Sequence, residues 1–169
     1  MKKEDYTIRS KQYAIVYADH ICFKCKSPMI FSGFMLPPRH EELWIDEEPE
    51  LDEWEVQQVS VMLFDIVSIT DQALSNMRDV NPNYKVSVNG EGISHYENCC
   101  PSCSAIQSYR YLYRSGSPLY PSTIEGVLNI NVKVYTSSND WNIKCTSSYD
   151  IGAVPDEIYN GFINTIQKR

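Results

Sequence analysis

Two Cys-x-x-Cys pairs constrain the fold of this chain more than any other feature. Cys22 and Cys25 form the first pair, in "HICFKCKSP", and Cys100 and Cys103 form the second, in "NCCPSCSAIQ". A zinc ion takes four soft or borderline ligands in a tetrahedron, and one such turn places two sulfurs on the same side of a tight loop. The spacing therefore predicts that both pairs meet around one Zn²⁺ ion, with a subdomain inserted between them. A site of four sulfurs has no position left for water, so the predicted zinc is structural rather than catalytic.

Other uses of these cysteines stay open from the sequence. They include a thioredoxin-like redox pair, disulfides, buried free thiols after loss of the metal, and an iron–sulfur cluster. Neither pair lies in a clear βαβ context, which disfavours the redox pair. Cys99, His20 and His95 lie near the two pairs, and each is an alternative ligand. Otherwise we expect Cys99 and Cys145 to be buried spare thiols.

The negative charge of the chain is concentrated in one segment. The net charge is −7 over 169 residues, and the stretch 41–55, "EELWIDEEPELDEWE", holds nine of the 22 acidic residues and no basic one. Such a balance disfavours generic nucleic-acid binding, which needs a basic surface. The stretch is interpreted either as a solvated loop or as a docking face for a basic protein partner. The predicted partner-binding residues are Trp44, Asp46, Glu47, Glu48, Glu50, Asp52, Glu53 and Trp54.

Hydrophobic patterning predicts a mixture of strands and helices. Strands are expected at 12–25, 27–36, 84–88, 105–116, 126–135 and 141–145, with 137–140 as the loop of a C-terminal hairpin. The acidic stretch is expected as a loop. Apolar residues at spacings of three, four and seven predict a helix over 53–80, although the β-rich run 59–69 also suits a strand. A last helix is expected from Pro155 to the C-terminus. These elements predict an α+β fold with zinc-ribbon-like antiparallel strands, an inserted helix, and a C-terminal β-hairpin plus helix.

The run 81–121 resembles a group of poorly characterised bacterial zinc-ribbon proteins. In these proteins an early Cys-x-x-Cys is paired with a late Asn-His-Cys-Pro-x-Cys-Gly-Ala-x-Gln-Gly motif and a proline-aromatic turn. The matching residues here are Tyr96, Asn98, Cys100, Pro101, Cys103, Ala105, Gln107 and the "PLYP" of 118–121, with "CFKCKSP" in the first half. The resemblance covers residues 12–121 and implies a zinc ribbon with an inserted helix and no known catalytic activity. Residues 122–169 then form a strand-strand-helix extension within a single domain spanning 1–169.

Three positions depart from the pattern of that group. The histidine of its motif is Cys99 here, and the glycines that follow the two cysteine pairs are Lys26 and Ser104. Glycine at these positions takes a positive φ and lets backbone N–H groups point at the sulfurs. A metal is still expected at the four cysteines in spite of these departures.

The function that these features favour is protein binding without catalysis. We expect an immunity protein that neutralises a co-encoded bacterial toxin through its acidic and aromatic surface. No signal peptide or bilayer-spanning run is visible, so a cytoplasmic location is expected.

Two other function classes have weaker support. A nucleic-acid-binding or transcription-associated zinc ribbon would use Lys24, Lys26, Arg110 and Arg114, interleaved with Tyr109, Tyr111 and Tyr113. An enzyme is disfavoured because the chain has only three histidines, and the carboxylates clustered in 41–55 are of the kind that is usually just solvated. His40 lies in a predicted loop, and no phosphate-binding loop or nucleophile elbow is present.

Overall fold

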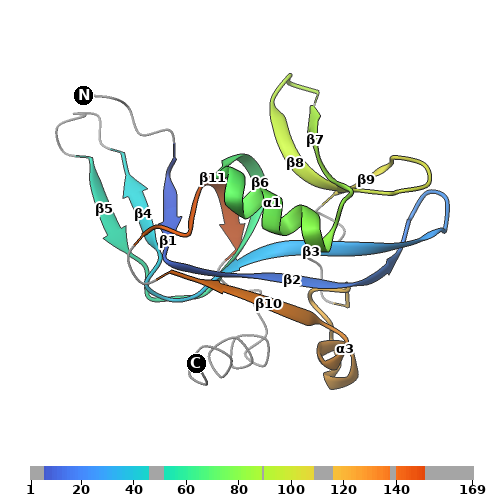
Figure 1. Cartoon of the computed structure of the whole chain (residues 1–169). Helices are drawn as coiled ribbons and strands as arrows, with labels where there is room; N and C mark the ends of the chain where they lie inside the picture. Colours follow the sequence, from blue (N-terminus) through green and yellow to red (C-terminus); the bar gives the residue numbers. More distant parts are fainter. Residues whose placement is uncertain (1–5, 46–51, 89, 109–115, 138–139, 151–169) are drawn as a thin grey trace.

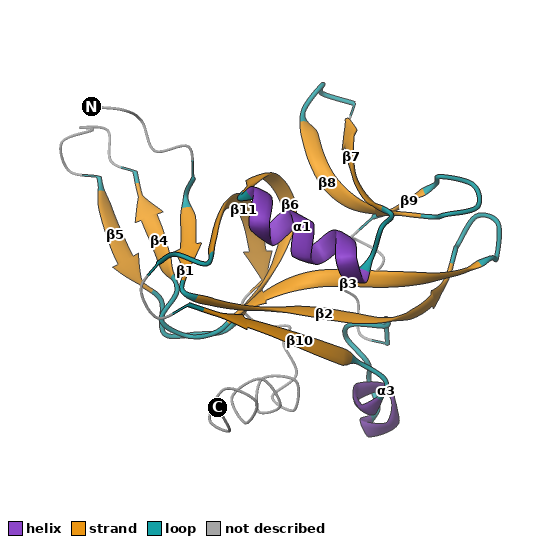
Figure 2. Cartoon of the chain, in the orientation of Figure 1, coloured by secondary structure: helices purple, strands orange, loops and turns teal. Residues whose placement is uncertain are grey.

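The computed structural model describes residues 6–45, 52–88, 90–108, 116–137 and 140–150, and in them the chain is mostly antiparallel β-sheet (Figures 1 and 2). The strands are β1 (Ile8–Ser10), β2 (Gln12–Ile21), β3 (Pro28–Leu36), β4 (Glu41–Trp44), β5 (Glu53–Val56), β6 (Val61–Ile69), β7 (Tyr84–Val88), β8 (Ser94–Cys99), β9 (Ile106–Gln107), β10 (Asn131–Thr136) and β11 (Ile143–Asp150). The helices are α1 (Asp71–Val80) and α3 (Ile124–Leu128).

The main sheet has the strand order β10-β2-β3-β6-β11-β1-β4-β5, with every neighbouring pair antiparallel. Its longest hairpin is β2–β3, which pairs without interruption from Ala14 opposite Met35 to Ile21 opposite Pro28. The first cysteine pair lies in the turn of this hairpin. A rigid two-stranded arm therefore carries Cys22 and Cys25.

Both faces are buried at the centre of the main sheet, and the alternation along β2 shows how. Tyr13 and Ile15 point into one cluster of core residues, and Ala14 and Val16 point into another. The first face is covered by α1, whose Ala73, Leu74 and Met77 are buried. The second face is covered by Leu119, Tyr120 and the residues around α3. Successive side chains of β2 thus point alternately into two different core clusters, as expected for a strand that is covered on both sides.

A bend in β6 joins the main sheet to a small second sheet. Asp65 has a φ of 49°, and the pairing of β6 with β11 shifts register beside it. Before the bend, Leu63 lies opposite Phe34 of β3; after it, Ile66 lies opposite Tyr96 of β8. Strands β7, β8 and β9 complete the second sheet. Because β8 leads directly into the second cysteine pair, this bend places that pair relative to the first.

The expected α+β fold is wrong, since the described chain is a β-rich fold with two short helices. The helix predicted over 53–80 is confined to 71–80, and the alternative strand over 59–69 is confirmed as β6. The bend explains the error. Leu63, Ile66 and Ile69 are all buried. Between Phe64 and Ser68, β6 holds two more residues than the β11 segment it pairs with, and the resulting spacing of three imitates a helix.

Four smaller predictions also need correction. The acidic stretch, expected as a loop, supplies strands β4 and β5. The strand expected over 126–135 begins only at Asn131, and Leu128, 79% exposed, ends α3. β10 and β11 do not form the expected hairpin, because β10 pairs with β2 while β11 pairs with β6 and β1. Of the strand expected over 105–116, the described part contains only β9, and 109–115 lie outside the described residues. The helix expected from Pro155 also lies outside the described residues.

In the part of the chain that is described, no helix has the length and apolarity to cross a membrane.

Candidate metal centre and acidic hairpin

The four predicted cysteines converge at one point of the fold. The sulfurs of Cys22, Cys25, Cys100 and Cys103 all lie within 4.8 Å of one another, and we call these residues the cysteine cluster. The Sγ atoms of Cys22 and Cys103 are 3.8 Å apart, and those of Cys25 and Cys100 are 3.5 Å apart. The turn after β2 and the turn after β8, which carry them, lie side by side in Figure 1. The fold therefore positions four thiols to bind one metal ion.

The two turns of the cysteine cluster have the same backbone structure. In the first, the Cys22 N–H donates to the Ser27 carbonyl at 2.9 Å, and the Lys26 N–H donates to the Cys22 carbonyl at 3.0 Å. In the second, the Cys100 N–H donates to the Ala105 carbonyl and the Ser104 N–H donates to the Cys100 carbonyl, both at 2.9 Å. Each turn is thus a closed knuckle that presents its two sulfurs together.

Lys26 and Ser104 occupy the strained position of each knuckle. Their φ angles are 63° and 59°, in the left-handed region that glycine adopts most easily. A non-glycine residue there costs about 1–2 kcal/mol. The knuckles therefore keep the conformation that glycine supports in the resembling proteins, and each pays a local strain for doing so.

The geometry of the cysteine cluster fits a tetrahedral ion. Zinc–sulfur bonds of about 2.3 Å in a tetrahedron place neighbouring sulfurs about 3.8 Å apart. The two contacts across the cluster, at 3.8 and 3.5 Å, are close to this spacing. They are far longer than a sulfur–sulfur bond of about 2.05 Å. Four protein sulfurs leave no open coordination position, which is the arrangement of a structural site.

The electrostatics of the cysteine cluster also favour a cation. Hydrogen bonds from the side chain and backbone of Ser27 lower the pKa of Cys25 to about 6. The Ala105 N–H lowers the pKa of Cys103, but burial and the three neighbouring thiols outweigh it and raise that pKa to about 11. One thiol thus ionises easily and another resists, because burial and hydrogen bonds with the neighbouring thiols favour its neutral form. A bound cation favours the ionised form of its sulfur ligands.

A buried amide joins the two knuckles. Gln107 lies in β9, just after the second knuckle, and is 2% exposed. Its Nε2 donates to the Ala105 carbonyl at 3.1 Å and lies 3.5 Å from the Sγ atom of Cys22. Its Oε1 accepts from the Phe23 N–H at 3.2 Å. Gln107 therefore bonds to both knuckles and to one sulfur of the cluster.

A second group of buried amides fastens the second knuckle to the main sheet. The Oδ1 atom of Asn98 accepts from the Ser32 N–H at 2.9 Å and from the Asn81 Nδ2 at 2.8 Å, and its own Nδ2 donates to the Ser32 carbonyl. All three residues are buried. Since each buried polar group finds a partner, the network holds β8, β3 and the end of α1 in one arrangement.

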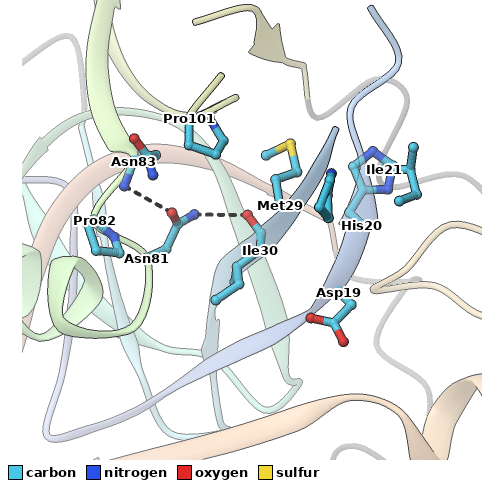
Figure 3. Close-up of a pocket in the computed structure, with 10 residues that line it drawn as sticks. Asp19, His20, Ile21, Met29, Ile30, Asn81, Pro82, Asn83 and Pro101 are labelled. Atoms are coloured by element: carbon cyan, nitrogen blue, oxygen red, sulfur yellow. Dashed lines mark hydrogen bonds between the residues drawn. The ribbon is translucent and has the colours of Figure 1, made fainter. Parts of the chain in front are cut away.

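A hollow of about 800 Å³ opens beside the knuckles (Figure 3). Met29 and Pro101 line it from the two knuckle sides, with Ile21 and Ile30 on the β2–β3 arm. Asn81 also lines it, and its Nδ2 donates to the Ile30 carbonyl while its Oδ1 accepts from the Asn83 N–H. The wall is thus mainly apolar.

The alternative ligands are not part of the cysteine cluster. Among the described residues, only the four predicted cysteines form a cluster that can hold a metal, so Cys99, His20 and His95 are outside it. Cys99 and Cys145 are buried, as expected for spare thiols. Burial raises the pKa of Cys99, and it raises that of Cys145 to about 12, so both stay protonated near neutral pH.

The acidic stretch forms a β4–β5 hairpin at the far edge of the main sheet from β10, and we call it the acidic hairpin (Figure 1). Of its predicted partner-binding residues, Asp46, Glu47, Glu48 and Glu50 lie outside the described residues. Trp44 is 63% exposed, and Asp52 and Glu53 are exposed as well. The hairpin thus presents an aromatic ring among carboxylates.

One face of the acidic hairpin places like charges against each other. Glu42 lies directly opposite Glu55, and Trp44 lies directly opposite Glu53. Directly opposite residues share a face, and like charges in that position are destabilising. Glu42 also accepts a hydrogen bond from the Tyr149 hydroxyl at 2.7 Å. Burial and this carboxylate together raise the pKa of Tyr149 to about 12.

Trp54 lies on the other face of the hairpin and is not free. The Arg9 guanidinium lies 3.9 Å from the centre of the Trp54 ring and 4.3 Å from that of Trp141. Its Nη2 also forms an ion pair with Glu41 at 2.6 Å. Trp54 therefore fixes the hairpin to β1, and Trp44 is the ring that remains accessible.

The residues of the nucleic-acid hypothesis are only partly described. Lys24 and Lys26 lie in the first knuckle, where the Lys26 Nζ donates to the Phe23 carbonyl at 2.8 Å. Tyr109, Arg110, Tyr111, Tyr113 and Arg114 lie outside the described residues. The basic and aromatic stripe therefore stays a prediction.

Comparison of the chain with models of protein families, with curated proteins and with solved structures finds no match. The resemblance to zinc-ribbon proteins consequently depends on the motif residues and on the geometry of the two knuckles.

Proposed function

We propose that this protein is a zinc-stabilised, non-enzymatic module that binds a basic protein partner through its acidic hairpin. The main support for metal binding is that the four cysteine sulfurs all lie within 4.8 Å of one another. Thiolates select soft or borderline ions, and a tetrahedral set of four suits zinc. The ion would tie the tip of the β2–β3 arm to the turn between β8 and β9. Because the four sulfurs fill its coordination shell, its contribution is to stability.

The partner-binding part is supported by the position of β5 at the edge of the main sheet. Gln57, just after β5, bonds to the backbone of Arg39 and His40 on the β4 side, at 2.7 and 2.9 Å. Backbone groups alternate in direction along a strand, so those of Trp54 and Val56 point to the outer edge. An extended segment of a partner can add to such an edge as a further strand.

Charge determines what kind of segment fits there. Glu53 and Glu55 are exposed on β5, and Glu42 faces Glu55 from β4. Lysine or arginine side chains on an added strand would relieve the repulsion between these carboxylates. Trp44, exposed on the same face, offers an aromatic anchor of the type that dominates binding energy. The proposed occupant is therefore a basic, extended segment of another protein.

More specifically, we propose that the protein is an immunity protein and that its partner is a co-encoded basic toxin. A small acidic domain with an accessible acidic edge suits this role, because complementary charge speeds association with a basic target. Co-expression with the product of a neighbouring gene tests this form. Rescue of growth supports it, and toxicity that persists contradicts it.

The binding surface itself is tested with defined peptides. The probe is a short peptide that alternates lysine and valine, and its affinity is measured by calorimetry. We expect the Glu53→Lys/Glu55→Lys variant to bind it at least about tenfold more weakly. The matched control, Asp79→Lys/Glu91→Lys, makes the same change in net charge at two exposed positions elsewhere.

Two further peptides separate strand addition from simple charge attraction. A peptide that alternates glutamate and valine should not bind. A lysine-valine peptide with methylated backbone nitrogens on one edge should bind more weakly, because it cannot pair with β5. Equal binding by the wild type and the Glu53→Lys/Glu55→Lys variant would refute the proposed surface.

A further inference from the structure

The side chain of Gln107 has only one orientation that satisfies its surroundings. Its Oε1 faces a donor, the Phe23 N–H at 3.2 Å, and its Nε2 faces two acceptors, the Ala105 carbonyl at 3.1 Å and the Cys22 Sγ at 3.5 Å. A flipped amide would set its oxygen against the carbonyl and its NH₂ group against the Phe23 N–H. Both amide hydrogens are therefore assigned, one to each acceptor.

This assignment defines the role of the Cys22 sulfur. Since Gln107 supplies the hydrogen, the sulfur accepts, and a thiolate accepts far better than a thiol. Cys22 is fully buried, and its sulfur also interacts with the backbone N–H groups of Cys25 and Lys24 in its own knuckle, so Gln107 is the donor that comes from the second knuckle. The amide thus fixes the position of one of the four sulfurs that would bind a metal.

Gln107 also fixes the distance between the knuckles. It extends from β9 in the second knuckle, where it bonds to Ala105, to the first knuckle, where it bonds to the Phe23 N–H between Cys22 and Cys25. The bonds to Phe23 and Ala105 involve backbone atoms, so they hold the knuckles together whatever the state of the sulfurs.

We propose that Gln107 is a positioning residue for the metal: it holds the two knuckles at binding distance and orients the Cys22 sulfur, and so sets the affinity of the site. The inference rests on the proposed zinc site. Residues that orient metal ligands through hydrogen bonds typically change metal affinity about 10- to 100-fold when they are replaced.

The test replaces the hydrogen bonds but keeps the size of the side chain. Gln107→Met is unbranched and of similar length but cannot donate, and Gln107→Glu keeps the shape while adding a negative charge beside the sulfurs. Zinc affinity is measured by competition with a chromophoric chelator. We expect the dissociation constant to rise about 10- to 100-fold in Gln107→Met and further in Gln107→Glu. Gln72→Met and Gln72→Glu, at an exposed position of α1, are the controls and should keep the wild-type affinity.

Two readouts separate positioning from simple packing. Cobalt(II) serves as a spectroscopic probe, and loss of the hydrogen bond to sulfur should move the thiolate-to-cobalt charge-transfer band to lower energy. Urea unfolding of the metal-free proteins measures the packing contribution alone. If Gln107→Met lowers metal-free stability but keeps the wild-type zinc affinity and cobalt band, the residue only packs and the inference is wrong. If the wild type itself binds neither ion, the zinc site and this inference both fail.

Discussion

The cysteine cluster lies between the tip of the β2–β3 arm and the second sheet, the acidic hairpin lies at the edge of the main sheet, and the two regions follow opposite rules. At the cysteine cluster, polar groups are buried and matched, as the bonds of Gln107 and Asn98 show. At the acidic hairpin, Glu42 faces Glu55 and Trp44 is left exposed, so charges and apolar surface are unmatched. The first region is arranged for stability. The second keeps a costly surface that the fold does not need, and such a surface is where we place the function.

We expect the largest loss of stability when a metal ligand is replaced. Cys100→Ser removes one of four ligands, so we expect loss of the metal and a fall of about 4 kcal/mol or more in the free energy of unfolding. Urea unfolding with metal content measured in parallel checks this. Cys99→Ser, at the adjacent buried cysteine outside the cluster, should retain the metal. A Cys100→Ser variant as stable as the wild type would mean that the knuckles need no ion.

An intermediate effect is expected where the knuckles are strained. Ser104→Gly relieves the positive φ of 59° and should raise the free energy of unfolding by roughly 0.5–1 kcal/mol. Ser102→Gly, in the same knuckle but not at a positive φ, should instead lower it by roughly 0.5–1 kcal/mol. Equal effects at both positions would show that the strain at Ser104 is not real.

The smallest stability effect is expected at the acidic hairpin. Glu53→Lys/Glu55→Lys replaces the repulsion between Glu42 and Glu55 by attraction, so stability should rise by about 0.2–1 kcal/mol. Thermal unfolding at low and high salt checks the value and its electrostatic origin, because salt should reduce it. A loss of more than about 1 kcal/mol would indicate that the carboxylates support the fold and would remove the contrast between the two regions.

The members of the cysteine cluster could be predicted from the sequence because the geometry of each knuckle is local. A Cys-x-x-Cys turn fixes two sulfurs within a few residues, and the positive φ at Lys26 and Ser104 confirms the position expected for glycine. The long-range partners could not be read in this way. Nothing near Gln107 in the sequence shows that it reaches Phe23, and nothing near Arg9 shows that it stacks on Trp54 and Trp141.

The fold class was mispredicted for a different physical reason. Secondary-structure periodicity assumes an unbroken strand or helix, and the bend at Asp65 breaks β6 so that its buried residues imitate a helix. The acidic hairpin was missed as strands because charge hides the pattern there. Leu43 and Trp54 face each other within it, but the acids around them favour a loop by composition.

Metal analysis of the purified protein tests most directly whether the four cysteines hold one structural zinc ion. Plasma mass spectrometry on protein prepared without added metal should find about one zinc per chain in the wild type and in Cys99→Ser, and almost none in Cys100→Ser. Wild-type protein that contains no zinc, and that takes up none at neutral pH after reduction, would contradict the account.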